Sequence, residues 1–168
     1  KDAFYFLPSE NEWYKAAYYN PGGSNYFLYP TASSSVPTAV GSGTDAGSAV
    51  YNGAAAVPAI VDSAGGLSPY GTMGQGGNVW EWNESAFDGS NSLSSESRAI
   101  RGGNWFNTEF DLRSSGRDDS GPADELDFFG FRVASADAAP IPEPGTWAAA
   151  VLLAGAAGYT RWRRRRAP

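Results

Sequence analysis

Gly77-Asn78-Val79-Trp80-Glu81-Trp82 is the segment that says most about the fold of this chain. Gly76 and Gly77 form a turn. From Trp80 on, bulky apolar and polar side chains alternate, which is typical of a half-buried strand. Residues 98–105 and 128–134 have the same strand-like character. The sequence therefore predicts three strands around an aromatic core.

A helix is predicted near residues 9–19, ahead of these strands. Ser9 and Glu12 have the spacing of a capping box, in which the serine oxygen accepts from the third amide and the glutamate reaches back to the cap amide. The buried stripe of this helix is expected to consist of Trp13, Tyr14, Ala16 and Ala17. Asn20-Pro21-Gly22-Gly23 ends it.

The remaining segments of residues 1–134 are predicted to be extended or loop. Residues 1–8 form a short extended stretch stopped by a proline, and residues 22–70 form a loop of about fifty residues. Loops of that length are usually functional or held by a ligand; a variable surface insertion is the alternative for residues 31–48. A short helical turn is expected at residues 111–117 and an acidic loop at residues 118–127.

The composition excludes several kinds of chemistry. The 168 residues include no cysteine and no histidine, so disulfides, thiolate nucleophiles, thiolate or imidazole metal sites and serine–histidine catalysis are all absent. The net charge is −6, but residues 1–144 hold seven Lys and Arg against all eighteen Asp and Glu, a net of −11. Such a body repels nucleic acid and attracts cations, so no nucleic-acid partner is expected.

The end of the chain has a different character. Residues 135–144 form a small-residue linker that contains Pro142, Glu143 and Pro144, residues 145–160 form an apolar run, and residues 161–168 are rich in arginine. The run is close to the ~20 residues that span a bilayer, and the arginines favour a cytoplasmic C-terminus. A transmembrane helix is therefore predicted at residues 145–160; a buried core helix is the alternative.

Four blocks resemble the sulfatase-modifying-factor family, whose type member is the formylglycine-generating enzyme. They are residues 7–17 (LPSENEWYKAA), 77–82 (GNVWEW), 101–105 (RGGNW) and 130–134 (GFRVA). The resemblance implies an α+β, C-type-lectin-related fold with irregular loops. Members of the family have a further segment of the domain before the first block, and only six residues precede that block in this sequence. Residues 1–134 are therefore expected to be a partial domain, with any export signal upstream.

Residues 140–166 resemble the PEP-CTERM sorting signal of exported bacterial proteins. The matching features are Pro142, Glu143 and Pro144, the apolar run, and an arginine cluster at Arg163, Arg164, Arg165 and Arg166. The resemblance implies an exosortase-type membrane protease as a partner. It also implies an inner-membrane-anchored precursor that passes to the cell surface or the extracellular polysaccharide matrix.

The enzyme-type members oxidise a substrate cysteine with a pair of copper-binding cysteines after the third block. Here the corresponding stretch is Asn107-Thr108-Glu109-Phe110-Asp111-Leu112, which contains no thiol. Soft Cu(I) prefers thiolate or thioether ligands, and the single methionine, Met73, lies elsewhere. No copper, no catalytic residue and no formylglycine-generating activity are expected.

The second block is the candidate metal site. In the calcium-binding family members it supplies carbonyl oxygens at the positions of Gly77 and Val79 and a carboxylate at Glu81, the hard oxygen ligands that Ca²⁺ requires. Those members usually add an acidic or amide side chain where this chain has Gly74. The alternative is that Glu81 pairs with Arg101 or caps a turn, and that the two tryptophans fill the core.

The arginines and aromatic residues are expected to be mainly structural. The four arginines beside the motif blocks are predicted to pair with Glu10, Glu12 or residues 118–127, with an anion site as the alternative; they are Arg101, Arg113, Arg117 and Arg132. Core packing is expected for most of the aromatic side chains that could otherwise stack on a sugar or a peptide, namely Tyr18, Tyr19, Tyr26, Trp105 and Phe106.

Two functional hypotheses follow from these observations. The first is an exported, surface- or matrix-associated, non-catalytic binding or structural module. The second is an enzyme on the same scaffold that uses a hard cation. A pocket where Asn107, Glu109, Asp111 and Arg113 converge would favour the enzyme, whereas carboxylates held by arginines would favour the module.

Overall fold

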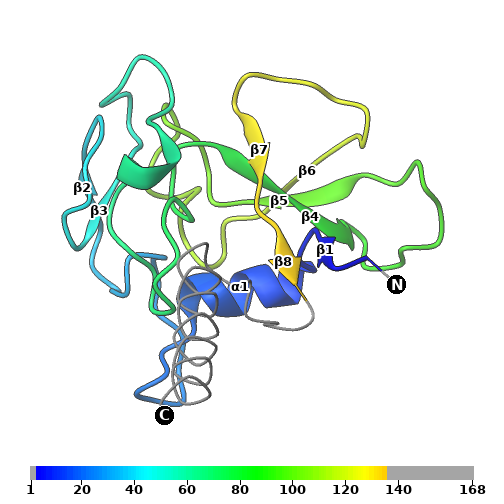
Figure 1. Ribbon diagram of the computed structural model, residues 1–168, viewed down its shortest axis with the longest axis horizontal. Coiled ribbons are helices and arrows are strands. Elements are labelled where there is room, and N and C mark those ends of the chain that lie inside the picture. Colours follow the sequence, from blue (N-terminus) through cyan, green and yellow to red (C-terminus); the bar gives the residue numbers. More distant parts are fainter. Residues whose placement is uncertain (1–2, 136–168) are drawn as a thin grey trace, which may run out of the picture. The chain divides into compact units, whose positions relative to one another are not determined.

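The computed structural model of the chain describes residues 3–135. The elements of this part of the chain are short and are joined by long irregular segments (Figure 1). In order they are β1 (Tyr5–Phe6), α1 (Glu10–Tyr18), β2 (Thr38–Ala39), β3 (Ser48–Ala49), the 3₁₀ helix η1 (Val61–Ser63), β4 (Trp80–Ala86), β5 (Arg98–Arg101), β6 (Asp118–Ser120), β7 (Phe129–Phe131) and β8 (Ala134–Ser135).

Helix α1 begins at the predicted capping box. The Ser9 hydroxyl accepts a hydrogen bond from the Glu12 amide at 3.3 Å, and the Glu12 carboxylate accepts one from the Ser9 amide at 2.8 Å. Its buried residues are Trp13, Ala17 and Tyr18. The helix is therefore confirmed, but Tyr18 takes the place in the buried stripe that was expected for Ala16.

The four-stranded sheet has the order β6-β5-β4-β7. β5 is antiparallel to β4 and β6, whereas β7 runs parallel to β4, so the sheet is mixed. β4 carries the second motif block, β5 the start of the third, and β7 the start of the fourth. The three predicted strands are thus neighbours, and α1 packs along β4 (Figure 1).

The long loop between α1 and β4 contributes to the core. It contains β2, β3 and η1, and its buried Tyr29, Ala49 and Tyr51 pack with Leu112. The loop is joined to the second motif block at Gly77, where φ is +72° and an added Cβ would collide with the carbonyl oxygen of Val50. Glycine is required there because the two backbones approach so closely.

Two local predictions were wrong. Residues 111–117 form hydrogen-bonded turns instead of a helical turn. The expected acidic loop begins with a strand, since Asp118–Ser120 pairs with β5 as β6. An edge strand tolerates aspartates because their carboxylates stay in water while the backbone pairs. β1 and β8, from the two ends of the described part, form a small separate sheet.

Several predictions concern the C-terminal segment, which lies outside the described residues. These are the linker with Pro142, Glu143 and Pro144, the span at residues 145–160, and the cluster Arg163, Arg164, Arg165 and Arg166. Within residues 3–135, none of the helices has the length and apolar character needed to cross a membrane.

Candidate functional site

A buried carboxylate lies where three of the motif blocks meet. The side chain of Glu81 in β4 is 7 % exposed. One of its oxygens accepts hydrogen bonds from Trp13 Nε1 and Arg132 Nε, both at 2.5 Å, and the other accepts from Arg132 at 2.5 Å. Arg132 also donates to the carbonyl of Met73 at 3.1 Å. Glu81 therefore joins α1 to the chain just after β7.

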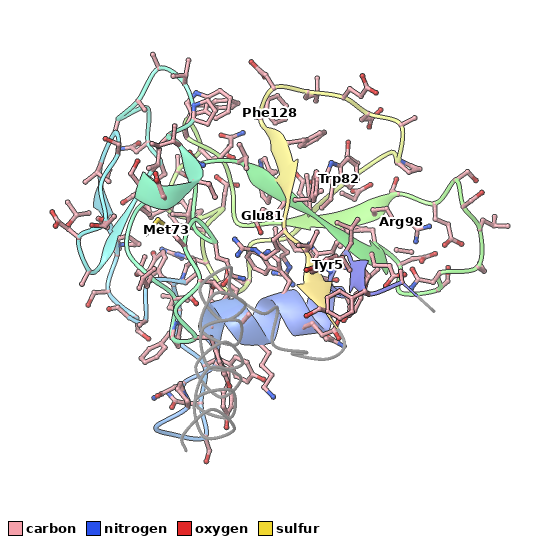
Figure 2. The ribbon with its side chains drawn as sticks, in the orientation of Figure 1. Tyr5, Met73, Glu81, Trp82, Arg98 and Phe128 are labelled. Carbon is pink, nitrogen blue, oxygen red and sulfur yellow. The ribbon has the colours of Figure 1, made fainter. Side chains whose placement is uncertain are left out.

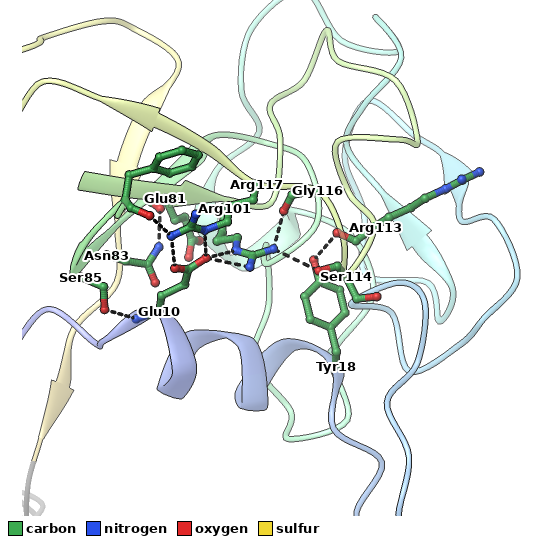
Figure 3. A network of polar contacts seen from close by, with 11 residues as sticks. Glu10, Tyr18, Glu81, Asn83, Ser85, Arg101, Arg113, Ser114, Gly116 and Arg117 are labelled. Atoms are coloured by element: carbon green, nitrogen blue, oxygen red, sulfur yellow. Dashed lines mark hydrogen bonds and ion pairs between the residues drawn. The ribbon is translucent and has the colours of Figure 1, made fainter. Parts of the chain in front are cut away.

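A second carboxylate, Glu10 at the start of α1, binds two arginines (Figure 3). Arg101 contacts one Glu10 oxygen at 2.7 Å, and Arg117 contacts both oxygens at 2.6 and 2.9 Å. Arg101 also donates to the carbonyls of Ser114 and Gly116, at 3.0 and 2.5 Å. Glu10 and its two arginines thus hold α1 against β5 and against the turns that lead to β6.

The charges of the two arginines determine the ionisation of Glu10. Burial by itself would raise the pKa of this carboxyl, but the hydrogen bond from Arg117 and the charges of Arg101 and Arg117 outweigh it, so the net pKa is lowered from 4.5. The hydrogen bond to Glu10 in turn raises the pKa of Arg117. Both groups are therefore held in their charged forms.

The predicted arginine partners are partly confirmed. Arg101 and Arg117 pair with Glu10 as expected. The alternative pairing of Glu81 with Arg101 is wrong, although the two residues are opposite each other in the β4–β5 register. Arg101 instead binds Glu10, which comes from α1. Glu81 is bound by Arg132, which follows β7 on the opposite edge of β4 from β5.

Arg113 pairs with no carboxylate within the described residues. It donates to the Tyr29 hydroxyl at 3.1 Å and lies over the ring of Phe110, 4.2 Å from its centroid. It thus makes a neutral hydrogen bond and a cation–π contact in place of the expected ion pair.

The arrangement around Glu81 does not fit a calcium ion. Calcium needs six to eight oxygen ligands, and both Glu81 oxygens are already bound by the Arg132 guanidinium, whose charge opposes a cation beside it. Gly77 and Val79 offer only backbone oxygens, and Gly74 offers no side chain. Within residues 3–135 no three acidic side chains gather as metal ligands. The contacts thus favour a structural role for Glu81.

Three side chains of the stretch that replaces the family's cysteines, and of the residue after it, each have a separate local partner. The Asn107 side chain accepts from the Asn104 amide at 2.9 Å, and Asp111 accepts from the Thr108 amide at 3.2 Å. Arg113 is directed to Tyr29. Two hollows in the described part of the chain are both lined by residues other than Asn107, Glu109, Asp111 and Arg113.

The aromatic residues divide between core and surface. Tyr18 is fully buried, with its hydroxyl donating to the Leu112 carbonyl at 3.0 Å, and Trp105 is also buried, as expected for core packing. Tyr26 and Phe106 are about half exposed, so core packing does not describe them. Burial raises the pKa of Tyr18, so its hydroxyl stays protonated in the core.

A groove on the sheet was not predicted from the sequence. Its residues include Trp82 and Arg98, which Figure 2 labels on the two central strands, and Phe131 of β7. The signal was present in the alternation of residues 128–134, because strand parity places Phe129 and Phe131 on the face opposite Arg132.

Comparison with known families agrees with the four blocks. The model of the sulfatase-modifying factor enzyme 1-like domain matches residues 2–137. The chain belongs to this family. No curated protein matches the chain.

Solved structures show the same fold. Treponema denticola variable protein 1 is 22 % identical, with a TM-score of 0.52, and CarF is 19 % identical, with a TM-score of 0.54. Each match covers 79 % of this chain and 48 % of the other chain. This family member therefore spans about half the length of the structures that it matches, and the likeness establishes the formylglycine-generating-enzyme-like fold alone.

The first prediction concerns Glu81. We expect Glu81→Gln to lower the free energy of unfolding by about 2 kcal/mol, because the partly buried Arg132 guanidinium loses its counter-charge. The amide keeps one acceptor and Arg132 is partly exposed, so the loss falls below that of a fully buried pair. Added calcium should leave the melting temperature of both proteins unchanged. Urea unfolding and thermal melts measure these effects.

The exposed Glu125→Gln variant is the control for loss of one acidic charge. If calcium raises the melting temperature of the parent and Glu81→Gln abolishes that rise, the calcium interpretation is correct and the ion-pair interpretation is wrong.

The second prediction concerns Glu10 and pH. Its pKa in the folded protein lies below the ordinary value of 4.5, so its ion pairs stabilise the fold above pH 4.5, and this stabilisation is lost as the pH falls through the folded pKa. We expect Glu10→Gln to be less stable at neutral pH and to lose less stability on acidification. The measurement is urea unfolding between neutral pH and pH 3, with Glu125→Gln as control. Parallel pH curves for parent and Glu10→Gln would contradict it.

Proposed function

We propose that this chain is a non-catalytic binding or structural module of the formylglycine-generating-enzyme-like fold. The observation that carries the proposal is the absence of cysteine from the whole chain, including the stretch 107–112 where the enzyme-type members hold copper. Copper chemistry of that kind needs a thiolate pair, and the amide and carboxylate side chains in its place are poor ligands for Cu(I).

The ion pairs give the proposal independent support. Glu10 and Glu81, two of the three carboxylates in the motif blocks, are each bound by arginine, and the third, Glu12, caps α1. A carboxylate held in this way is a weak general base, because its lone pairs are occupied by hydrogen bonds from the guanidinium. The alternative, a hard-cation-dependent enzyme on the same scaffold, needs carboxylates free to bind the metal.

We further propose that the module is exported and works at the cell surface or in the extracellular polysaccharide matrix. Support comes from the sequence alone: the Pro-Glu-Pro element at 142–144, the apolar run 145–160 and the arginine cluster 163–166. These features match what an exosortase-type protease would recognise on a membrane-anchored precursor. The arginine cluster would lie on the cytoplasmic side by the positive-inside rule, which leaves the body of the chain on the outer side.

The third prediction tests the lack of catalysis. The full chain, supplied with copper, oxygen and a cysteine-containing peptide, should convert no thiol to aldehyde above a protein-free blank, since it has no thiolate pair to bind the metal. Mass spectrometry of the peptide measures the product. A family member that retains both cysteines is the positive control, and turnover by this chain would refute the proposal.

The fourth prediction tests sorting. Replacing Arg163, Arg164, Arg165 and Arg166 with alanine should leave more unprocessed precursor in the membrane fraction, because the charge that fixes orientation is lost. Replacing the same four with lysine keeps the charge and should restore the orientation. Immunoblots of membrane and external fractions from a host with an exosortase measure this, and unchanged processing in the alanine variant would count against the sorting proposal.

A further inference from the structure

Two neighbouring hollows form one groove over the face of the sheet that points away from α1. Glu81 contacts Trp13 of α1, so the alternation at this end of β4 turns the neighbouring Trp82 to the other face. The hollows measure about 790 and 430 Å³ and share three lining residues, Trp82, Asp124 and Phe131. We call this the sheet groove.

The floor of the sheet groove is aromatic. Trp82 of β4 and Phe131 of β7 are register partners, so their side chains leave the same face side by side. Phe129 packs edge-on against Trp82, with ring centroids 5.2 Å apart. Phe131 is 67 % exposed, so its ring is accessible to a ligand. The floor thus offers a flat apolar surface to a ligand.

The rim of the groove supplies both donors and acceptors. Asp124 uses one oxygen to accept from Ser120 Oγ at 2.6 Å and the Gly121 amide at 2.8 Å, and its other oxygen has no partner within the described residues. These hydrogen bonds, the one from Ser120 first, lower the pKa of Asp124, so it remains a charged acceptor.

Arg98 is the cationic donor of the rim. It is bound by the carbonyls of Glu84 and Leu93 and by Asn91 Oδ1, at 3.2, 3.3 and 2.9 Å, and it pairs with no carboxylate within the described residues. The amide nitrogen of Asn91 likewise has no partner among the described residues. The guanidinium is therefore positioned by neutral groups and keeps donor capacity for a ligand.

We propose that the sheet groove binds a neutral saccharide chain. The C–H face of a sugar ring packs on aromatic rings, and each hydroxyl both donates and accepts, which matches a rim that holds a carboxylate, an amide and a guanidinium. The larger hollow lies within the size range of ligand pockets. This inference deepens the proposed function, because it names the ligand class of the binding module and rests on that role.

Other ligand classes match the groove less well. A purely apolar ligand would cover the second oxygen of Asp124 and the charge of Arg98 without offering either a polar group. An anionic polymer would be repelled by the excess of acidic residues in the body of the chain. An extended peptide would pair with the backbone of an edge strand, β6 or β7, instead of crossing the face of the sheet.

The experiment is a titration of the full chain with two neutral probes, cellohexaose and laminarihexaose, followed by calorimetry and tryptophan fluorescence. We expect at least one probe to bind at millimolar concentration or below and to change the fluorescence, since Trp82 forms the floor. Phe131→Ala should weaken binding about tenfold, because an aromatic contact is lost. Asp124→Asn should weaken it severalfold.

Phe110→Ala is the matched control, since Phe110 is 58 % exposed, like Phe131, but lies away from the groove; it should bind as the parent does. The inference is overturned if neither probe binds, if Phe131→Ala binds unchanged, or if oligogalacturonate or a strand-forming peptide binds more tightly than the neutral probes. A chain that binds no saccharide and oxidises no thiol loses this inference but keeps its non-catalytic assignment. Thiol oxidation would remove the proposed function whatever the saccharide result.

Discussion

The contact of Glu81 with Arg132 and Trp13 is the constraint on which the rest of the described structure depends. A carboxylate in the interior is costly unless its oxygens are hydrogen-bonded and its charge is balanced. Here an indole and a guanidinium do both, and they come from segments more than fifty positions away in the chain on either side. The cost of an unpaired charge therefore enforces the assembly of α1, β4 and the segment after β7. A fold with so little regular structure needs such specific contacts, because its strands are too short to define an arrangement by themselves.

The second carboxylate extends this arrangement across the sheet. Glu10 holds Arg101 from β5 and Arg117 from the chain just before β6, so two glutamates on the α1 side of the sheet gather three arginines. Arg101 then satisfies the carbonyls of Ser114 and Gly116, which lie in turns without regular pairing. Polar groups thus supply the order that a larger aliphatic core supplies in other domains.

Local features of this fold could be predicted from the sequence, and choices between distant partners could not. The capping box at Ser9 and Glu12 and the alternation of Trp80, Glu81 and Trp82 act within a few residues, so pattern was sufficient for α1 and β4. Glu81 could pair with Arg101 or Arg132. Arg132 is its partner because α1 places Glu10 against Arg101, and this depends on tertiary packing that local sequence does not show. β6 was missed for a related reason, since an edge strand of aspartates pairs through its backbone and shows no apolar pattern. To predict the sheet groove one needs the strand parity, which the sequence provides, and the exposure of Phe131 within residues 3–135, which only the structure provides.

The sheet therefore has two faces with different roles. On the α1 side, glutamates and arginines of the family blocks pair with one another and stabilise the fold. On the other side, aromatic rings remain exposed, and Arg98 is held by neutral acceptors without a counter-charge from the described residues. Phe131 is exposed there beside ordered polar groups, which is the arrangement that the proposed saccharide ligand would cover. The groove and the ion-pair network use opposite faces of the same strands, so the proposed binding role is compatible with the ion pairs that hold α1.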